Sequence, residues 1–299
     1  MSPVVRISFL DGGSSIGASE AVLKLHDYRC LNNIRETYDK NLPWSQSKEQ
    51  AYREYLAESP FPAEVFDDPF FLIDHKIHHP GVFEACLERQ CQTSYKAEKE
   101  TYERLKEGQG TWLPRLYNCV SMQREDGTRV DGLLFEYIPS IPLYDFIETW
   151  ATRIPPLPID LLKRICDTTV SIVNRVSNFD ILNTDVRLYN FLIRESALVQ
   201  NEESEPEPYP VVLVDLAQCR FRRLDETDDE WKEAKCTEDE EGAAGCVLWQ
   251  KVNKCVGKDI WIYQQEYQHR RSEDSEQSPE DDVEEEGKGE EGKDEGACE

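Results

Sequence analysis

Alternating apolar and polar positions near the N-terminus predict two short strands. Residues 4–10 alternate in the way of a strand that is exposed on one face, and an Asp-Gly-Gly turn sequence ends the pattern. The apolar run 21–25 predicts the second strand. Residues 45–58 begin with a serine cap and then follow helical spacing, so we expect a helix there.

The middle of the chain predicts a long helix followed by a hairpin. Apolar positions repeat at helical spacing from residue 80 to residue 107. Strands are expected at 116–122 and 129–138, and Asp126-Gly127 between them is a dipeptide typical of tight hairpin turns. The hydrophobic period therefore changes from helical to alternating after the long helix.

Helices and short strands are expected in the second half of the chain. Helical patterns cover 143–150 and 158–178, and the second of these is amphipathic. Short strands follow at 190–194 and 211–215, separated by an acidic polar loop, and residues 226–256 are mostly charged and then mixed helical. Strands and helices do not alternate regularly along the chain, which predicts the α+β class.

The distribution of charge adds a tail and excludes one class of partner. The net charge is −26, and no basic stripe is present that would neutralise phosphates, so we expect no nucleic-acid partner. Residues 272–299 hold fourteen acids against two lysines and are nearly free of hydrophobes. Such a segment buries too little apolar surface to offset its ordering entropy, which predicts a disordered acidic tail.

Hydropathy and cysteine spacing indicate an intracellular address. No apolar run approaches the roughly 18 residues of a membrane span. The N-terminus lacks the basic and then apolar pattern of a signal peptide. We expect a cytoplasmic or nuclear protein with no membrane partner. The ten cysteines include no Cys-x-x-Cys pair, which favours reduced, buried thiols over a zinc site.

Three polar residues in the second half carry the chemistry. Asp185 is followed five residues later by Asn190, which opens an apolar strand, and Asp215 ends the next strand 25 residues further on. Phosphoryl transfer by kinases needs a carboxylate near the attacking hydroxyl, and an asparagine with a second carboxylate to hold magnesium. Oxygen ligands suit that hard cation. The spacing and the strand context match the kinase catalytic-loop and D-F-G patterns.

The chain therefore resembles protein-kinase-like phosphotransferases, and the resemblance extends upstream. The strand Ala-Val-Leu-Lys that ends at Lys24 is similar to the strand whose lysine meets the α- and β-phosphates of ATP. Glu98, in the long helix, would be the ion-pair partner of this lysine, and Glu100 is the alternative. These positions imply an ATP-binding site.

The same resemblance implies further site residues. Glu136 and Ile138 lie in a segment similar to the strand and hinge that hold adenine by backbone groups. Gly12, Gly13 and Gly17 would make an abbreviated loop over the phosphates, or simply a turn. Arg187 stands where many kinases have a lysine facing the γ-phosphate, and it can supply that charge with a different geometry.

The resemblance implies a two-lobed kinase-like domain over residues 1–271, with a small lobe at about 1–138 and a larger helical lobe at about 139–271. Only 54 residues separate Ala217 from the acidic tail, and no Ala-Pro-Glu sequence is present, so the C-terminal lobe is expected to be shortened. Segments such as VLKLHDYR and VDLAQCRFR further resemble a divergent group of kinase-like proteins in filamentous fungi.

Two functions remain open from the sequence. The first is ATP- and magnesium-dependent transfer of phosphate to a protein or small-molecule acceptor, which the presence of a base at Asp185 favours. The second is a pseudokinase that binds nucleotide or partners without transfer, which Thr184, in place of the catalytic-loop arginine, favours. Residues 26–97 have no ordinary kinase counterpart, and form either a regulatory or partner surface or an insertion packed over the small lobe.

Overall fold

The computed structural model describes residues 2–10, 16–38, 43–58, 80–154, 156–199 and 208–265. All of these belong to one compact unit of the chain, Met1–Tyr267. Gly12 and Gly13 of the predicted glycine loop and the predicted acidic tail 272–299 lie outside the described residues.

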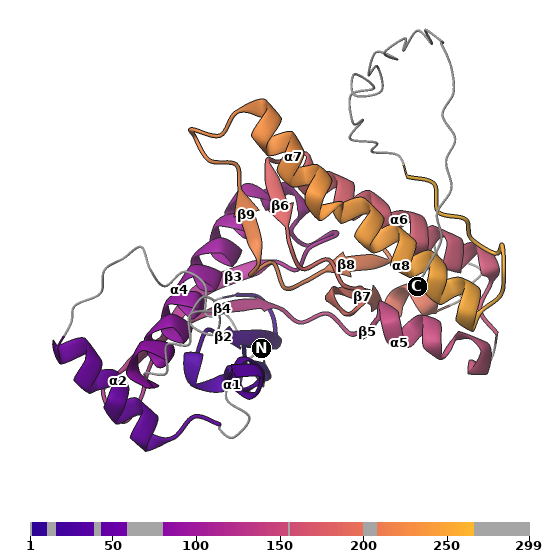
Figure 1. Cartoon of the computed structure of the whole chain (residues 1–299). Coiled ribbons are helices and arrows are strands. Elements are labelled where there is room, and N and C mark those ends of the chain that lie inside the picture. The colour runs from indigo at the N-terminus through magenta and orange to yellow at the C-terminus, as the bar shows by residue number, and fades with distance from the viewer. Residues whose placement is uncertain are drawn as a thin grey trace, which may run out of the picture. The chain divides into compact units, whose positions relative to one another are not determined.

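A four-stranded antiparallel sheet forms the N-terminal part of the fold (Figure 1). Its order is β1-β2-β4-β3, and the strands are β1 (Val4–Ser8), β2 (Glu20–Leu25), β3 (Leu116–Gln123) and β4 (Arg129–Glu136). Because β2 is an inner strand, Lys24 lies opposite Val4 on one neighbour and Leu133 on the other. The predicted hairpin joins β3 to β4, and Gly127 in its turn has a φ of +82°, which glycine adopts without strain.

The segment after β2 packs on the first half of a long helix. It contributes η1 (Tyr28–Cys30), α1 (Asn32–Tyr38) and α2 (Gln46–Glu58), and the long helix is α4 (Pro80–Arg104). Figure 1 shows α2 beside α4. Gly81 allows this close approach, because a Cβ there would lie 2.4 Å from the carbonyl oxygen of Ala51. Tyr28, Tyr52 and Phe83 are buried in the resulting cluster.

A buried ion pair lies inside this inserted part of the fold. Arg35 Nη2 is 2.5 Å from Glu84 Oε2, and Arg35 Nε is 3.0 Å from Glu84 Oε1. Both side chains are fully buried. A two-point contact of this kind compensates the loss of water around both charges, so each residue depends on the other.

The C-terminal part is mainly helical and carries two small sheets. Its helices are α5 (Leu143–Glu148), α6 (Ile159–Ser177), α7 (Asp228–Glu238) and α8 (Glu240–Cys255). One sheet has the order β5-β7-β8, with β5 (Ser140–Pro142), β7 (Phe191–Arg194) and β8 (Val211–Leu213). The other pairs β6 (Ile181–Asn183) with β9 (Cys219–Phe221). Single turns complete the fold: η2 (Lys106–Gly108) after α4, and η3 (Trp150–Thr152), η4 (Leu188–Asn190) and η5 (Glu195–Leu198) in the C-terminal part.

The main core lies where α6, α8 and the small sheets meet. α6 is amphipathic as the sequence predicts, and its apolar face supplies Leu162, Ile165, Val173 and Val176 to this core. Among the described residues, no helix has both the length and the apolar character that crossing a membrane requires. The fold is of the α+β class, in agreement with the prediction from the sequence.

Some expectations from the sequence need correction. The strand predicted to begin at Asn190 begins at Phe191, and the strand predicted to end at Asp215 ends at Leu213. The helix α1 and the strands β5, β6 and β9 were not predicted, because segments of three to seven residues leave little periodic pattern. Buried thiols were expected, but four of the described cysteines are exposed: Cys30, Cys119, Cys236 and Cys246.

Candidate active site

A cavity of about 320 Å³ lies between the four-stranded sheet and the pair β7–β8. Strands β1, β2 and β4, helix α4 and the chain just after β4 form its walls. Six of the residues singled out from the sequence line it: Lys24, Glu98, Glu136, Ile138, Asn190 and Asp215. Asp185 and Arg187 are not among the lining residues.

Lys24 contacts two carboxylates at the centre of this cavity. Its Nζ lies 2.7 Å from Glu98 Oε2 and 2.6 Å from Asp215 Oδ1. Burial by itself would lower the pKa of Lys24, but the carboxylates of Glu98 and Asp215 outweigh burial and raise the pKa above its ordinary value. The lysine is therefore held in its charged form. Glu100, the alternative partner, instead pairs with Arg104 on an exposed face of α4.

Glu98 organises the back of the cavity. Its side chain is almost completely buried, its Oε1 accepts a hydrogen bond from the backbone N–H of Leu216 at 3.3 Å, and its Oε2 lies 3.3 Å from His26 Nε2. One turn further along α4, burial and the nearby carboxylate of Glu98 raise the pKa of Tyr102 well above its usual range. Glu98 thus links β2, α4 and the chain after β8.

Asp215 adopts a backbone conformation that is rare for residues other than glycine. Its φ is +61°, in the left-handed region, and its side chain is 39% exposed. The backbone N–H of Val214 donates to the carbonyl oxygen of Asn190 at 2.8 Å, which ends the pairing of the two strands just before Asp215. Strained residues of this kind cluster at functional sites, and here the turn directs the carboxylate toward Lys24.

The hydrogen bonds of Asn190 fix the direction of its amide. Nδ2 donates to the backbone oxygen of Asp185 at 2.8 Å and to Asp185 Oδ2 at 3.2 Å. Because a carbonyl oxygen must face a donor, the amide nitrogen has to lie on this side. Asn190 also lines the cavity, together with Asp215, the other residue predicted to bind magnesium.

Asp185 is buried beside the cavity, and two side chains contact it. Arg187 Nε forms an ion pair with Asp185 Oδ1, although this contact lacks hydrogen-bond geometry, and Asn190 donates to Oδ2. The Arg187 side chain is 68% exposed. Arg187 thus contacts Asp185 in this structure, and its expected role beside a γ-phosphate stays a prediction.

A network that the sequence did not reveal positions the loop around Asp185. The backbone N–H of Asp185 donates to Asn183 Oδ1 at 3.0 Å, and the backbone N–H of Asn183 donates to Glu240 Oε1 at 2.6 Å. Glu240 Oε2 in turn lies 2.6 Å from Lys235 Nζ, where burial lowers the pKa of Lys235 although Glu240 opposes this. No motif pointed to Glu240, because it lies 57 residues from Asn183.

The residues after β4 border the cavity from the other side. Glu136 Oε1 lies 3.1 Å from Arg115 Nη1, so this carboxylate has its own cation partner. Ile138 is buried, and its carbonyl oxygen accepts a hydrogen bond from Ser140 Oγ at 2.8 Å. The Glu136 carboxylate and the Ile138 carbonyl oxygen thus each have a partner within the protein.

The donor atoms around the cavity fit a hard cation bound together with a ligand. Within the described ranges, no group of three or more His, Cys, Asp or Glu side chains is arranged to hold a metal ion by itself. Asn190 and Asp215 supply two kinds of oxygen donor, which suits magnesium when further oxygens come from phosphate groups or water.

Comparisons with known proteins add little beyond the geometry. No protein-family model matches the chain, and no curated protein matches it. Among solved structures, one match is "WaaP in complex with acyl carrier protein", with 19% sequence identity and a TM-score of 0.34. The match covers 50% of this chain and 56% of that chain, so it spans little more than half of that chain's length. A likeness this weak supports no statement about activity.

Proposed function

We propose that the chain is a kinase-like phosphotransferase that depends on ATP and magnesium and transfers the γ-phosphoryl group to a hydroxyl of a protein or small-molecule acceptor. The observation that carries this proposal is the pair of contacts of Lys24 with Glu98 and with Asp215. These residues lie 74 and 191 positions from Lys24, yet they converge in one cavity with Asn190.

In this proposal the domain has two lobes with the nucleotide between them. The small lobe covers about residues 1–138 and the shortened helical lobe about 139–271. Adenine lies against the backbone of Glu136 and Ile138, and Lys24 holds the α- and β-phosphates. Lys24 must then exchange Asp215 for phosphate oxygens, which frees the carboxylate of Asp215. Glu98 keeps Lys24 in place during this exchange.

Asn190 and Asp215 would hold magnesium, which when bound neutralises charge on the phosphates. Asp185 orients the acceptor hydroxyl and takes its proton as the hydroxyl oxygen bonds to the γ-phosphorus. The bond from this phosphorus to the bridging oxygen breaks, and ADP leaves. Arg187 moves from Asp185 to the γ-phosphate, a step that its exposed position permits.

A pseudokinase is the second candidate function. The contacts of Asp185 with Arg187 and Asn190 favour it, because a carboxylate engaged by two side chains is less available as a base. Such a protein would bind nucleotide, or a protein partner, without transfer. The two candidates share the nucleotide site and differ in what Asp185 does.

Thermal unfolding with ATP, magnesium and both together tests the shared site. A ligand at about 100 times its Kd stabilises the folded state by about 2.7 kcal/mol, and we expect this effect only with ATP and magnesium combined. ATP turnover on the same sample then separates the two candidates. Absence of any stabilisation by the combination would overturn both.

A further inference from the structure

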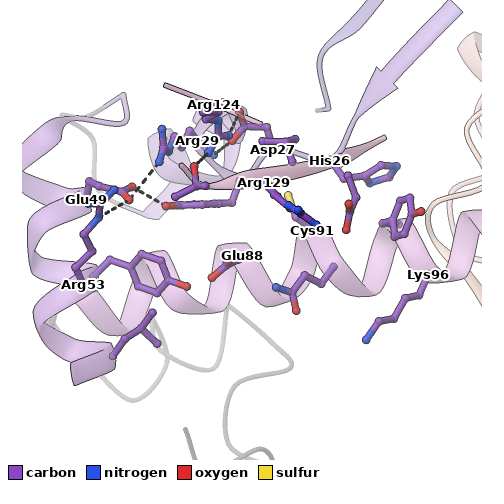
Figure 2. A pocket seen from close by; sticks show the side chains of 18 residues that line it. His26, Asp27, Arg29, Glu49, Arg53, Glu88, Cys91, Lys96, Arg124 and Arg129 are labelled. Carbon is purple, nitrogen blue, oxygen red and sulfur yellow. Dashed lines mark hydrogen bonds and ion pairs between the residues drawn. The ribbon is translucent and has the colours of Figure 1, made fainter. Parts of the chain in front are cut away.

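A second cavity of about 480 Å³ lies against α4 on the N-terminal side of Glu98 and Tyr102. Its walls are α4, the inserted η1 and α2, and the hairpin of β3 and β4 (Figure 2). Glu88 and Cys91 come from α4, and His26 comes from the end of β2. Nothing in the proposed phosphotransfer uses this cavity.

Most charges in the walls are already neutralised by one another. Glu49 accepts a hydrogen bond from the hydroxyl of Tyr28 at 2.6 Å and pairs with Arg29 and Arg53 at 3.2 and 3.1 Å. Arg124 forms an ion pair with Asp27 on the adjacent wall. Figure 2 shows these contacts gathered at one end of the cavity. They form a polar frame in which each charge already has a partner, so they offer no free charge to a ligand.

Glu88 differs from these residues. It is partly buried in the middle of the α4 wall, and Figure 2 shows it between Arg53 on one side and Lys96 on the other. In the part of the chain that the structure describes, Glu88 forms no ion pair. Burial, with a contribution from the carboxylate of Glu49, raises the pKa of Glu88, although a hydrogen bond with the side chain of Gln92 opposes this. The two remaining wall cations, Lys96 and Arg129, are exposed and pair with no described carboxylate. Asp131 is a second acid in the wall; it is exposed and pairs with no described cation.

His26 closes the cavity toward the nucleotide site. Its side chain is 1% exposed, and neither ring nitrogen forms a hydrogen bond with any described residue. Nε2 lies 3.3 Å from Glu98 Oε2, and the ring meets that of Tyr95 edge-on at 5.5 Å between centroids. The His26 imidazole, which contacts Glu98, therefore lies between the second cavity and the Lys24–Glu98 pair.

We propose that this second cavity binds a small organic cation, a protonated amine on an aromatic or apolar body, with the ammonium group on Glu88. The rings of Tyr28 and Tyr52 also line the cavity, and aromatic rings attract cations as well as apolar groups. A volume of about 480 Å³ lies within the range of small-molecule sites. The net charge of −26 draws cations to the protein and repels anions.

The position of His26 gives the site a route to the first cavity. An occupant that moves His26 changes the surroundings of Glu98, and so of Lys24. Binding at two coupled sites is reciprocal, so a bound amine changes the affinity for Mg·ATP by the same factor as Mg·ATP changes the affinity for the amine. This coupling rests on the proposed function, whereas binding of the amine does not.

Calorimetry with benzylamine at neutral pH tests the site, with benzyl alcohol as the uncharged analogue and benzoate as the anion. We expect benzylamine to bind at least tenfold more tightly than either. Glu88→Gln removes the charge and keeps the shape, and should weaken benzylamine at least tenfold while leaving benzyl alcohol unchanged. Glu103→Gln is the matched control, because Glu103 is an exposed glutamate of the same helix outside the cavity.

The location of the bound amine is tested by NMR of the histidine side chains. The His26 signal is assigned as the one that is missing from the spectrum of His26→Asn. Benzylamine should shift the His26 signal in the wild type and not in Glu88→Gln. Any of three results would overturn the proposal. Glu88→Gln binds benzylamine as tightly as the wild type does, Glu88→Gln and Glu103→Gln lose the same affinity for benzylamine, or benzoate binds more tightly than benzylamine. A sample that binds benzylamine but not Mg·ATP overturns the proposed function alone, and the reverse result overturns the amine site alone.

Discussion

Replacing Asp215 with asparagine and Asp185 with asparagine should impair the protein in two different ways. Asp215→Asn removes the charge from an ion pair with Lys24 at 2.6 Å, where the Asp215 side chain is 39% exposed. Exposed pairs contribute about 0–1 kcal/mol, and breaking a buried pair costs about 3–5 kcal/mol. This half-buried pair lies between these values, and Glu98 still neutralises Lys24. We therefore expect the free energy of unfolding to fall by about 1–2 kcal/mol.

Nucleotide binding should suffer more than stability in this variant. Asp215 is one of only two proposed protein ligands of magnesium, and it is the only charged one. We expect Mg·ATP affinity to fall about 100-fold, which corresponds to about 2.7 kcal/mol. Asp185 does not line the cavity, so Asp185→Asn should leave this affinity within about threefold. As the proposed base, it should lower transfer by roughly two to four orders of magnitude.

Calorimetric titration with Mg·ATP and a turnover assay on the same preparations measure both effects. Asp225→Asn is a suitable control, because the Asp225 side chain is 90% exposed and belongs to neither cavity. Identical defects in the variants of Asp185 and Asp215 would refute the separate roles. A binding defect in Asp215→Asn with no turnover in the wild type would instead identify the pseudokinase.

Three further outcomes are expected. Glu84→Gln leaves the fully buried Arg35 without a counter-charge and should cost about 3 kcal/mol, or about 6–12 °C in Tm, whereas Glu20→Gln in an exposed pair should leave Tm unchanged; equal shifts would contradict this. Thr184 cannot pair with a phosphorylated residue of the protein as an arginine at this position would, so phosphatase treatment should not alter turnover. A sharp drop in turnover would show that another basic residue pairs with such a phosphate. The pKa of Glu88 is raised in the folded protein above its unfolded value of about 4.5, so its contribution to stability declines as the pH rises through the folded pKa. Glu88→Gln should therefore raise Tm more at pH 8 than at pH 5. An equal gain at both pH values would be evidence against an unpaired carboxylate.

The sequence determined the longer elements of this protein and the spacing of its candidate site. Helices α4 and α6 and the β3–β4 hairpin match their predictions to within a few residues, because a period of 3.6 or 2 repeated over many positions is a local property. The interval from Asp185 to Asn190 is also local. A short turn lets the Asn190 side chain donate a hydrogen bond to the backbone oxygen of Asp185, so residues close together in the sequence determine this part of the site.

Only the tertiary structure decided which distant groups meet. Glu98 and Glu100 are nearly equivalent in sequence, but α4 turns Glu98 inward to Lys24 and leaves Glu100 on an exposed face with Arg104. The left-handed turn at Asp215 and the support of Asn183 by Glu240 follow from pairing between segments that are far apart along the chain. Whether a buried charge finds a partner depends on the packing of all the surrounding elements. No local pattern of residues contains that information.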